Sequence, residues 1–259
     1  MSLLSALVVD GEPCLEGATV VTLERSAPWP ADEVAAIESM MASFVAAGAR
    51  SAFTWAGSAA GRSALAQVAP PLVSGDDLSF TLHATQVDAR AFQILRHMVS
   101  LLEPANDQTI RRILVSCAAH RQPPRATLPE IDEENEGEQY PGELPDPGFA
   151  VVWDESMEYS KCRRVLVELA TRPDPAALDE LEVYAMDWAR LLEGGGFALP
   201  LGLPDVFESV MGCVSQLDVL TAEIEIPVYR ASESGFEVLL QMLAAYHQRI
   251  RPIQLVTIE

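Results

Sequence analysis

The sequence has little positive charge and almost no lysine. Its 259 residues carry 17 Lys and Arg against 38 Asp and Glu, a formal net charge of −21, and Lys161 is the only lysine. A field of this sign repels nucleic-acid phosphates and anionic lipid headgroups, so we expect neither nucleic-acid nor membrane binding. The same field favours fast, salt-sensitive association with basic proteins. The simpler interpretation is that the negative charge only keeps the protein soluble.

Long apolar runs are also missing. No run approaches the roughly 20 apolar residues that a membrane-spanning helix requires. The first residues, MSLLSALVVDGEP, have no basic region before their short apolar stretch. We therefore expect a strand there instead of a signal peptide, and a cytoplasmic protein.

Cysteine is scarce and scattered. The four cysteines form no CxxC pair, which favours buried free thiols over a disulfide scaffold; they are Cys14, Cys117, Cys162 and Cys213. Cys117 and His120 lie close in the sequence, but no second pair completes a tetrahedral metal site. We predict no metal and no cofactor.

Apolar residues are abundant outside one polar stretch. Hydrophobic residues make up 49% of the chain, which is enough to build a core. Residues 122–148, QPPRATLPEIDEENEGEQYPGELPDPG, are instead rich in proline, glycine and acidic side chains. We interpret 122–148 as an acidic linker between a first α+β repeat, 1–121, and a second, 149–259.

The two segments show the same order of patterns at one offset. ALVVDGE at 6–12 resembles AVVWDES at 150–156, an offset of 144 residues (154 − 10). The number of identical residues is close to chance. However, strands, helix ends and apolar faces recur in the same order and at the same spacing in both segments, which predicts an internal duplication. The matched patterns are strands 19–24 and 163–168, helices from Pro30 to Gly48 and from Asp174 to Gly194, strands 51–57 and 195–201, strands 77–84 and 221–228, and closing strands 110–116 and 253–259.

Each half therefore reads β–β–α–β–(short helix)–β–α–β, with the short helix of the first half at 61–68. Without the first strand and the short helix, the order is βαββαβ, the split βαβ order of ferredoxin-like α/β sandwiches. We predict an α+β fold of two tandem ferredoxin-like halves, each with an extra N-terminal strand and two helices on one face of its sheet.

Alternation along the strands predicts one open sheet face in each half. Leu78, Phe80 and Leu82 point to one side of their strand, and Ser79, Thr81 and His83 point to the other. In the second half, Glu223 and Glu225 oppose an apolar side, and Glu168 is expected to lie on the same face. Such a face must meet solvent, a ligand, the other half or a second chain.

The stretch GSAAGRS follows a predicted strand, as phosphate-binding loops do. Its candidate anion-binding residues are Gly57, Ser58, Gly61, Arg62 and Ser63. A P-loop needs four residues between the glycines and then lysine, whereas this stretch has three and an arginine. A plain small-residue loop is the competing interpretation.

Catalytic constellations are weak. Asp10 and Asp154 end strands matched by the offset and could act as an acid–base pair if they converge, although aspartates after strands commonly form turns. The histidines have no Ser, Cys or Asp at a spacing that defines a triad; they are His83, His97, His120 and His247. We predict no catalytic residue.

The leading hypothesis is a non-enzymatic, intracellular, bacterial-type binding protein whose acidic surface engages a basic protein, as an inhibitor or immunity-type protein would. One alternative is a small-molecule-binding protein or enzyme with a cleft between the repeats. Another is a structural protein that self-associates, for example as a homodimer, through its open sheets. The candidate partner-binding residues are Glu130, Asp132, Glu133, Glu134, Glu168, Glu223 and Glu225.

Overall fold

The computed structural model describes residues 8–11, 16–54, 63–88, 91–102, 110–117, 146–153, 164–194, 214–226 and 233–259. Helices and strands are mixed throughout these ranges, so the predicted α+β class is confirmed. None of the helices described is long and apolar enough to cross a membrane. The predicted strand 195–201, Asp154 and most of the acidic linker lie outside the described residues.

The described residues of the first half form one sheet and two helices. Its elements are β1 (Val8–Gly11), β2 (Gly17–Arg25), α1 (Ala31–Ala49), β3 (Ala64–Gln67), β4 (Leu72–Ser74), β5 (Asp77–Thr85), α2 (Ala91–Leu102) and β6 (Ile110–Cys117). The strand order is β1-β6-β2-β5-β3, with β4 also paired to β5. The β1–β6 pair is parallel and the other pairs are antiparallel.

The second half follows the same plan, with one strand fewer among its described residues. Its elements are β7 (Ala150–Trp153), β8 (Arg164–Leu169), α3 (Pro175–Glu193), β9 (Val214–Gln216), β10 (Thr221–Glu225), α4 (Glu233–Arg249) and β11 (Ile253–Ile258). The strand order is β7-β11-β8-β10-β9. The β7–β11 pair is parallel and the other pairs are antiparallel.

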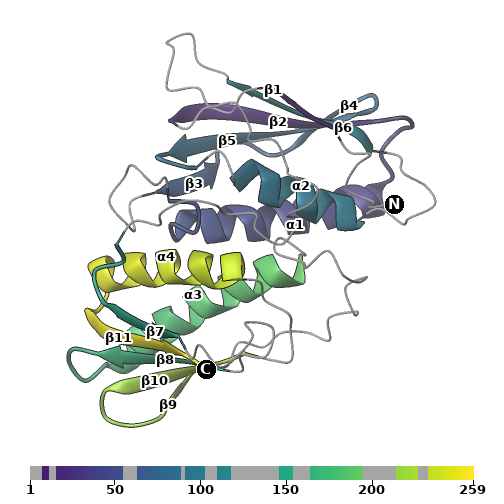
Figure 1. The fold of residues 1–259 in the computed structure, drawn as a ribbon. Coiled ribbons are helices and arrows are strands. Elements are labelled where there is room, and N and C mark those ends of the chain that lie inside the picture. Colours follow the sequence, from purple (N-terminus) through teal and green to yellow (C-terminus); the bar gives the residue numbers. More distant parts are fainter. Residues whose placement is uncertain are drawn as a thin grey trace.

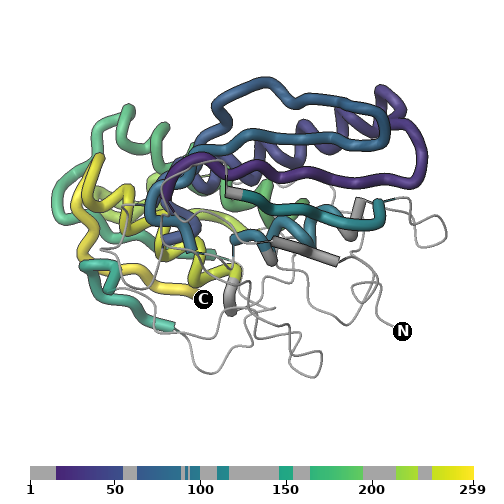
Figure 2. Tube along the Cα trace, turned by 90° about the horizontal axis from the view of Figure 1, so that it is seen from above, coloured from purple at the N-terminus to yellow at the C-terminus, as the bar shows by residue number. Residues whose placement is uncertain are grey.

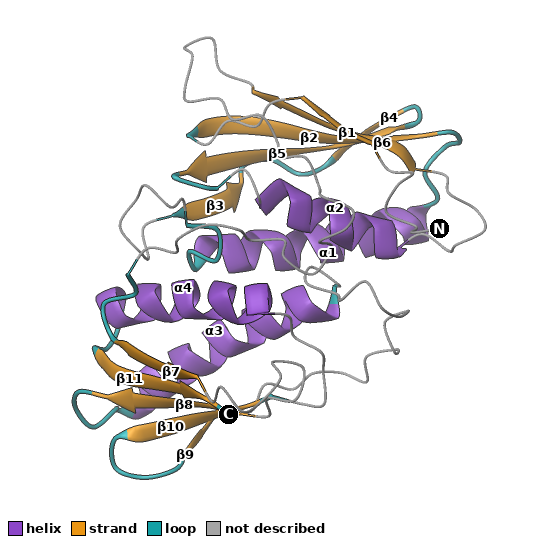
Figure 3. Cartoon of the chain, in the orientation of Figure 1, coloured by secondary structure: helices purple, strands orange, loops and turns teal. Residues whose placement is uncertain are grey.

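The halves meet through their helices. Figure 1 shows four layers, which are the first sheet, α1 with α2, α3 with α4, and the second sheet. Figure 3 shows the same order as two helical layers between two layers of strands. Seen from above, β2 and β5 lie side by side in the first sheet (Figure 2). Each sheet therefore turns one face toward the helices and the other away from both halves.

The inward face of each sheet follows the predicted alternation. Leu78, Phe80 and Leu82 of β5 are fully buried, as are Val165 and Val167 of β8. Burial of each such side chain contributes roughly 1.5–3 kcal/mol. The buried apolar side chains of the two halves form one continuous core.

Strand registers in the two halves correspond closely but not at one constant offset. Helices α1 and α3 both have 19 residues and begin 144 positions apart (175 − 31). Val21 pairs with Phe80 and Val165 with Ile224, again 144 apart on both strands (165 − 21, 224 − 80). The offset falls to 143 between β6 and β11 (258 − 115), because Val115 pairs with Val21 and Ile258 with Val165.

The outer parallel strands are offset by 142 residues. Asp10 pairs with Leu114, and Leu114 with Thr22, whereas Val152 pairs with Thr257, and Thr257 with Leu166. Because Thr22 and Leu166 are themselves equivalent, Asp10 corresponds to Val152 (152 − 10). The prediction that Asp10 and Asp154 end matching strands at the same position is therefore wrong.

The third strand of the first half lies elsewhere than predicted. Ser51 to Phe53 form a turn, with Ser51 at φ 67°, and Thr54 makes only an isolated bridge to Val87. The strand is β3, at Ala64–Gln67, within the segment 61–68 where we predicted a short helix. Local composition favours a helix there, but pairing with β5 overrides it.

Gly48 does not end α1 as predicted. The helix continues to Ala49, and a Cβ atom at Gly48 would lie 2.5 Å from Cβ of Leu65 on β3. This glycine lets the strand approach the helix closely. Gly194 does cap α3, and Asp174 begins it by accepting a hydrogen bond from the Ala177 N–H with Pro175 in the first turn, as the sequence predicts.

Candidate functional site

The outward face of the second sheet brings together three of the predicted partner-binding residues. Alternation along β8 and β10 buries Val165, Val167, Ala222 and Ile224 against α3 and α4. Glu168, Glu223 and Glu225 therefore lie on the opposite face, where Glu225 is exposed and the other two are half-buried. The sequence predicts this grouping, and the strand register sets its layout.

These carboxylates are close to one another on the sheet. Glu168 lies opposite Thr221, and Glu223 lies opposite Leu166, so Glu168 and Glu223 are diagonal neighbours, at roughly 7–8 Å by standard sheet geometry. Glu223 and Glu225 are two residues apart on one strand. Within the described ranges, no ion pair includes any of the three.

The one arginine on the described part of this face is already paired. Arg164 of β8 lies opposite Glu225 of β10, and its Nη2 atom is 2.6 Å from Oε1 of Glu259. The backbone groups of Arg164 and Glu259 also bond to each other at 2.9 and 3.1 Å. The described part of this face thus holds four glutamates and one arginine.

Apolar side chains lie beside the carboxylates. Val152 of β7 is 48% exposed, and Leu166 and Leu255 are half-buried. Leu255 lies directly opposite Glu168, and Thr257 separates Val152 from Leu166 across the strands. We name these six residues the second outer face: Val152, Leu166, Glu168, Glu223, Glu225 and Leu255. The sequence did not single out its leucines and valine, because an apolar residue in a strand is indistinguishable by composition from a core residue; their alternation with the inward positions was the available signal.

The equivalent face of the first sheet has different chemistry. Thr22 and Ser79, the counterparts of Leu166 and Glu223, share a hydrogen bond of 2.9 Å. Glu24, the counterpart of Glu168, lies 3.8 Å from Nη1 of Arg112, the counterpart of Leu255. This face therefore carries serine and threonine hydroxyls and a glutamate whose charge is balanced by Arg112.

The predicted anion loop is described only at its last residue. Gly57, Ser58, Gly61 and Arg62 lie outside the described residues. Ser63 is buried; its carbonyl accepts a 2.6 Å hydrogen bond from the Ser51 hydroxyl, and its own hydroxyl lies 3.2 Å from Thr54 Oγ1. These contacts hold the turn after α1 against the start of β3, which is a structural role.

The remaining predicted groups do not converge within the described residues. Glu130, Asp132, Glu133, Glu134, Asp154 and His120 lie outside them. His83 is exposed on the first sheet, whereas His97 is buried in α2. His247 accepts a hydrogen bond of 2.9 Å from the Ile253 N–H at its Nδ1 atom, which positions the start of β11. In the part of the chain described, no group of three or more His, Cys, Asp or Glu could hold a metal ion.

The junction between the halves is packed and ion-paired. Arg50, at the end of α1, places Nε 2.7 Å from Oδ2 of Asp187 on α3 and its guanidinium 5.0 Å from the Tyr184 ring centroid. Arg249 of α4 donates hydrogen bonds to the Ala49 carbonyl and, at 3.0 Å, to the Ser51 hydroxyl. These groups bind the halves to each other, so at these positions they are committed to structure.

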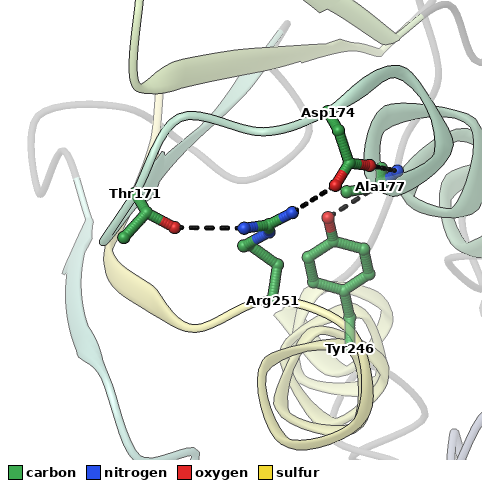
Figure 4. A network of polar contacts seen from close by, with 5 residues as sticks. All are labelled: Thr171, Asp174, Ala177, Tyr246 and Arg251. Carbon is green, nitrogen blue, oxygen red and sulfur yellow. Dashed lines mark hydrogen bonds and ion pairs between the residues drawn. The ribbon is translucent and has the colours of Figure 1, made fainter.

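A second polar network joins α3 to α4 (Figure 4). Arg251 donates to Asp174 at 2.5 Å and to Thr171 at 3.2 Å, and the Tyr246 hydroxyl donates to the Ala177 carbonyl at 2.9 Å. Burial raises the pKa of Tyr246 to about 12, and the nearby Arg251 charge opposes this shift. A tyrosine with a raised pKa that is hydrogen-bonded to a helix carbonyl holds the helix, and it is not poised as a base.

Comparison with protein-family models, with curated proteins and with solved structures found no match. Function is therefore inferred from the charge and the surfaces of the chain itself.

Proposed function

We propose that this chain is a non-enzymatic binding protein that engages a basic protein through its acidic surface. The observation that carries the proposal is the net charge of −21, with 38 acidic residues against 17 basic ones. Such a field accelerates capture of a cationic target and disfavours nucleic acid and anionic membranes. An inhibitor or immunity-type protein of the bacterial cytoplasm is the class that this charge suits.

The outward sheet faces support the proposal. In a layered protein whose helices pack between the sheets, each sheet keeps one face for contacts outside the two halves (Figure 3). In the second sheet that face presents Glu168, Glu223 and Glu225 without an ion pair among the described residues. The acidic run with Glu130, Asp132, Glu133 and Glu134 is a second proposed contact region.

We also propose that the two halves are copies of one ferredoxin-like unit, 1–121 and 149–259, joined by the linker 122–148. Support comes from the matching strand orders β6-β2-β5-β3 and β11-β8-β10-β9 and from the equal lengths of α1 and α3. Duplication accounts for one outward face in each half and allows the two faces to diverge.

The test is a capture experiment with the immobilised full chain and a bacterial lysate. Captured proteins are identified, purified and titrated against the chain at low ionic strength and again at about 0.15 M salt, where the Debye length is about 8 Å. We expect basic partners whose Kd rises steeply with salt. Partners without excess positive charge, or a Kd that salt leaves unchanged, would contradict the proposal.

A variant of the linker then tests whether the acidic run takes part in the contact. The linker variant replaces Glu130, Glu133 and Glu134 by Gln and Asp132 by Asn. If affinity for the purified partner is unchanged in this variant, the linker takes no part in binding, and the rest of the acidic surface carries the function.

A further inference from the structure

The second outer face is amphipathic along one direction. Its apolar members, Val152, Leu255 and Leu166, lie on β7, β11 and β8, and its carboxylates lie on β8 and β10. Leu255 and Leu166 are diagonal neighbours on adjacent strands, so an apolar strip borders an acidic strip. Figure 1 shows α3 and α4 covering one face of this sheet, and alternation along the strands places both strips on the other face.

No cation among the described residues pairs with the acidic strip. Neighbouring carboxylates on one sheet face repel each other, and a cation between them would relieve that repulsion. In the first sheet Arg112 supplies such a cation to Glu24. The equivalent position in the second sheet is Leu255, which is apolar, and the nearby Arg164 is held by Glu259.

We propose that the second outer face docks a segment of the basic partner that presents an apolar stripe bordered by arginine or lysine side chains. The apolar stripe covers Leu166, Leu255 and Val152, and the cations pair with Glu168, Glu223 and Glu225. This inference rests on the proposed function and adds the site and the chemistry of the bound segment.

Charge complementarity selects this occupant over a second copy of the chain. Two copies of the face would bring together four glutamates and one arginine from each chain, in molecules that both carry a net charge of −21. Repulsion opposes that contact. Cations from a basic protein instead neutralise the carboxylates while its apolar groups remove the exposed leucine and valine surface from water.

The test uses two synthetic peptides of identical composition. One is a helical peptide with a leucine stripe bordered by arginines, and the other has the same residues in scrambled order. Titration calorimetry measures Kd for the full chain at low ionic strength. We expect the striped peptide to bind more tightly than the scrambled one, because only it matches both strips.

Three variants locate the binding. The face variant changes Glu168, Glu223 and Glu225 to Gln. The matched control makes the same change in net charge on exposed helix positions, with Glu38→Gln, Asp179→Asn and Glu180→Gln. We expect the face variant to lose about tenfold in affinity and the control less than about twofold. Leu166→Thr, which installs the residue found at the equivalent position in the first sheet, should abolish the preference for the striped peptide.

The outcomes separate the two proposals. Equal losses in the face variant and its control would mean that the field of the whole protein attracts the peptide, which overturns the docking face and leaves the proposed function standing. Failure of both peptides to bind the wild-type chain would overturn the docking face, and the lysate capture with its salt titration would then decide the proposed function. If sedimentation shows that the wild-type chain is a dimer and that Leu166→Thr is a monomer, the second outer face binds a second copy of the chain, and the inference is overturned. Circular dichroism confirms that each variant is folded.

Discussion

The two halves have similar inward faces and different outward faces. Facing the helices, Val21 and Phe80 in the first sheet match Val165 and Ile224 in the second, and all four are buried. Facing outward, the hydrogen-bonded pair Thr22 and Ser79 is matched by Leu166 and Glu223. These inward positions pack in a common core, which restricts the side chains they can hold, whereas the outward positions lie away from that core and can differ more. A functional difference between the halves is therefore expected on the outer faces.

The two halves also differ at the first residues of their long helices, α1 and α3. Asp174 caps α3 and is itself held by Arg251, while Pro30, which has no side-chain hydrogen-bonding group, precedes α1. The end of α1 in turn receives Arg249 from the other half. The second half thus helps to stabilise a helix of the first. Substitutions at the junction therefore test whether the halves are independent of each other.

The largest effect is expected at that junction. Asp187→Ala removes a carboxylate that is 4% exposed and leaves Arg50 and Arg190 without their partner. Loss of one partner from a buried pair costs about 3 kcal/mol, at the low end because both arginines can reach solvent. Urea unfolding followed in both halves should show one transition at lower denaturant. Unfolding of the second half alone would show that the halves are independent.

The two glycines near the helix ends should respond differently. Gly48→Ala places a Cβ 2.5 Å from the Leu65 Cβ, which only a backbone shift can relieve, so we expect a loss of about 1–3 kcal/mol. Gly194→Ala places a Cβ 2.6 Å from the flexible end of Met98 and 3.3 Å from the Arg190 carbonyl oxygen, and Gly194 has a helical φ of −70°. Its cost should stay below about 1 kcal/mol. Equal losses in urea unfolding would contradict the close approach of β3 to α1.

Tyr246→Phe tests the polar network that joins α3 to α4. Loss of the hydrogen bond to Ala177 should cost about 1 kcal/mol at neutral pH. Because burial raises the pKa of Tyr246 from 10.0 to about 12, the folded protein keeps a proton that the unfolded chain releases. This stability is fully present below pH 10 and is lost as pH rises toward 12. The variant should show a shallower alkaline decline in unfolding free energy than the wild type, and an identical decline would assign that slope to other groups.

The smallest effect on stability is expected from Leu255→Arg. This change gives the second sheet the arginine that the first has at the equivalent position, and the new guanidinium lies opposite Glu168. Stability should change by less than about 0.5 kcal/mol, because exposed pairs contribute little. Affinity for the striped peptide should nevertheless fall severalfold, because one carboxylate is already neutralised. Unchanged affinity would show that Glu168 does not take part in binding the peptide.

The fold was predictable where periodicity is strong, and the site only in part. The long strands and helices, their buried faces and the outward position of the three glutamates follow from alternation of period 2 and from helical stripes. The third strand did not follow, because Ala64–Gln67 has no strand pattern of its own and becomes a strand by pairing with β5. Leu166 and Leu255 were missed because an apolar residue in a strand is indistinguishable by composition from a core residue.

What the sequence by itself determined is local and additive: the acidic field, the α+β class, the main elements and the cap at Asp174. Only the tertiary structure decided that the helices lie between the sheets, that Asp10 corresponds to Val152, and that Leu255 stands where Arg112 stands in the other half. Each of these depends on the register between strands distant in the chain. A shift of one residue would turn every side chain to the opposite face, and long-range packing selects the register.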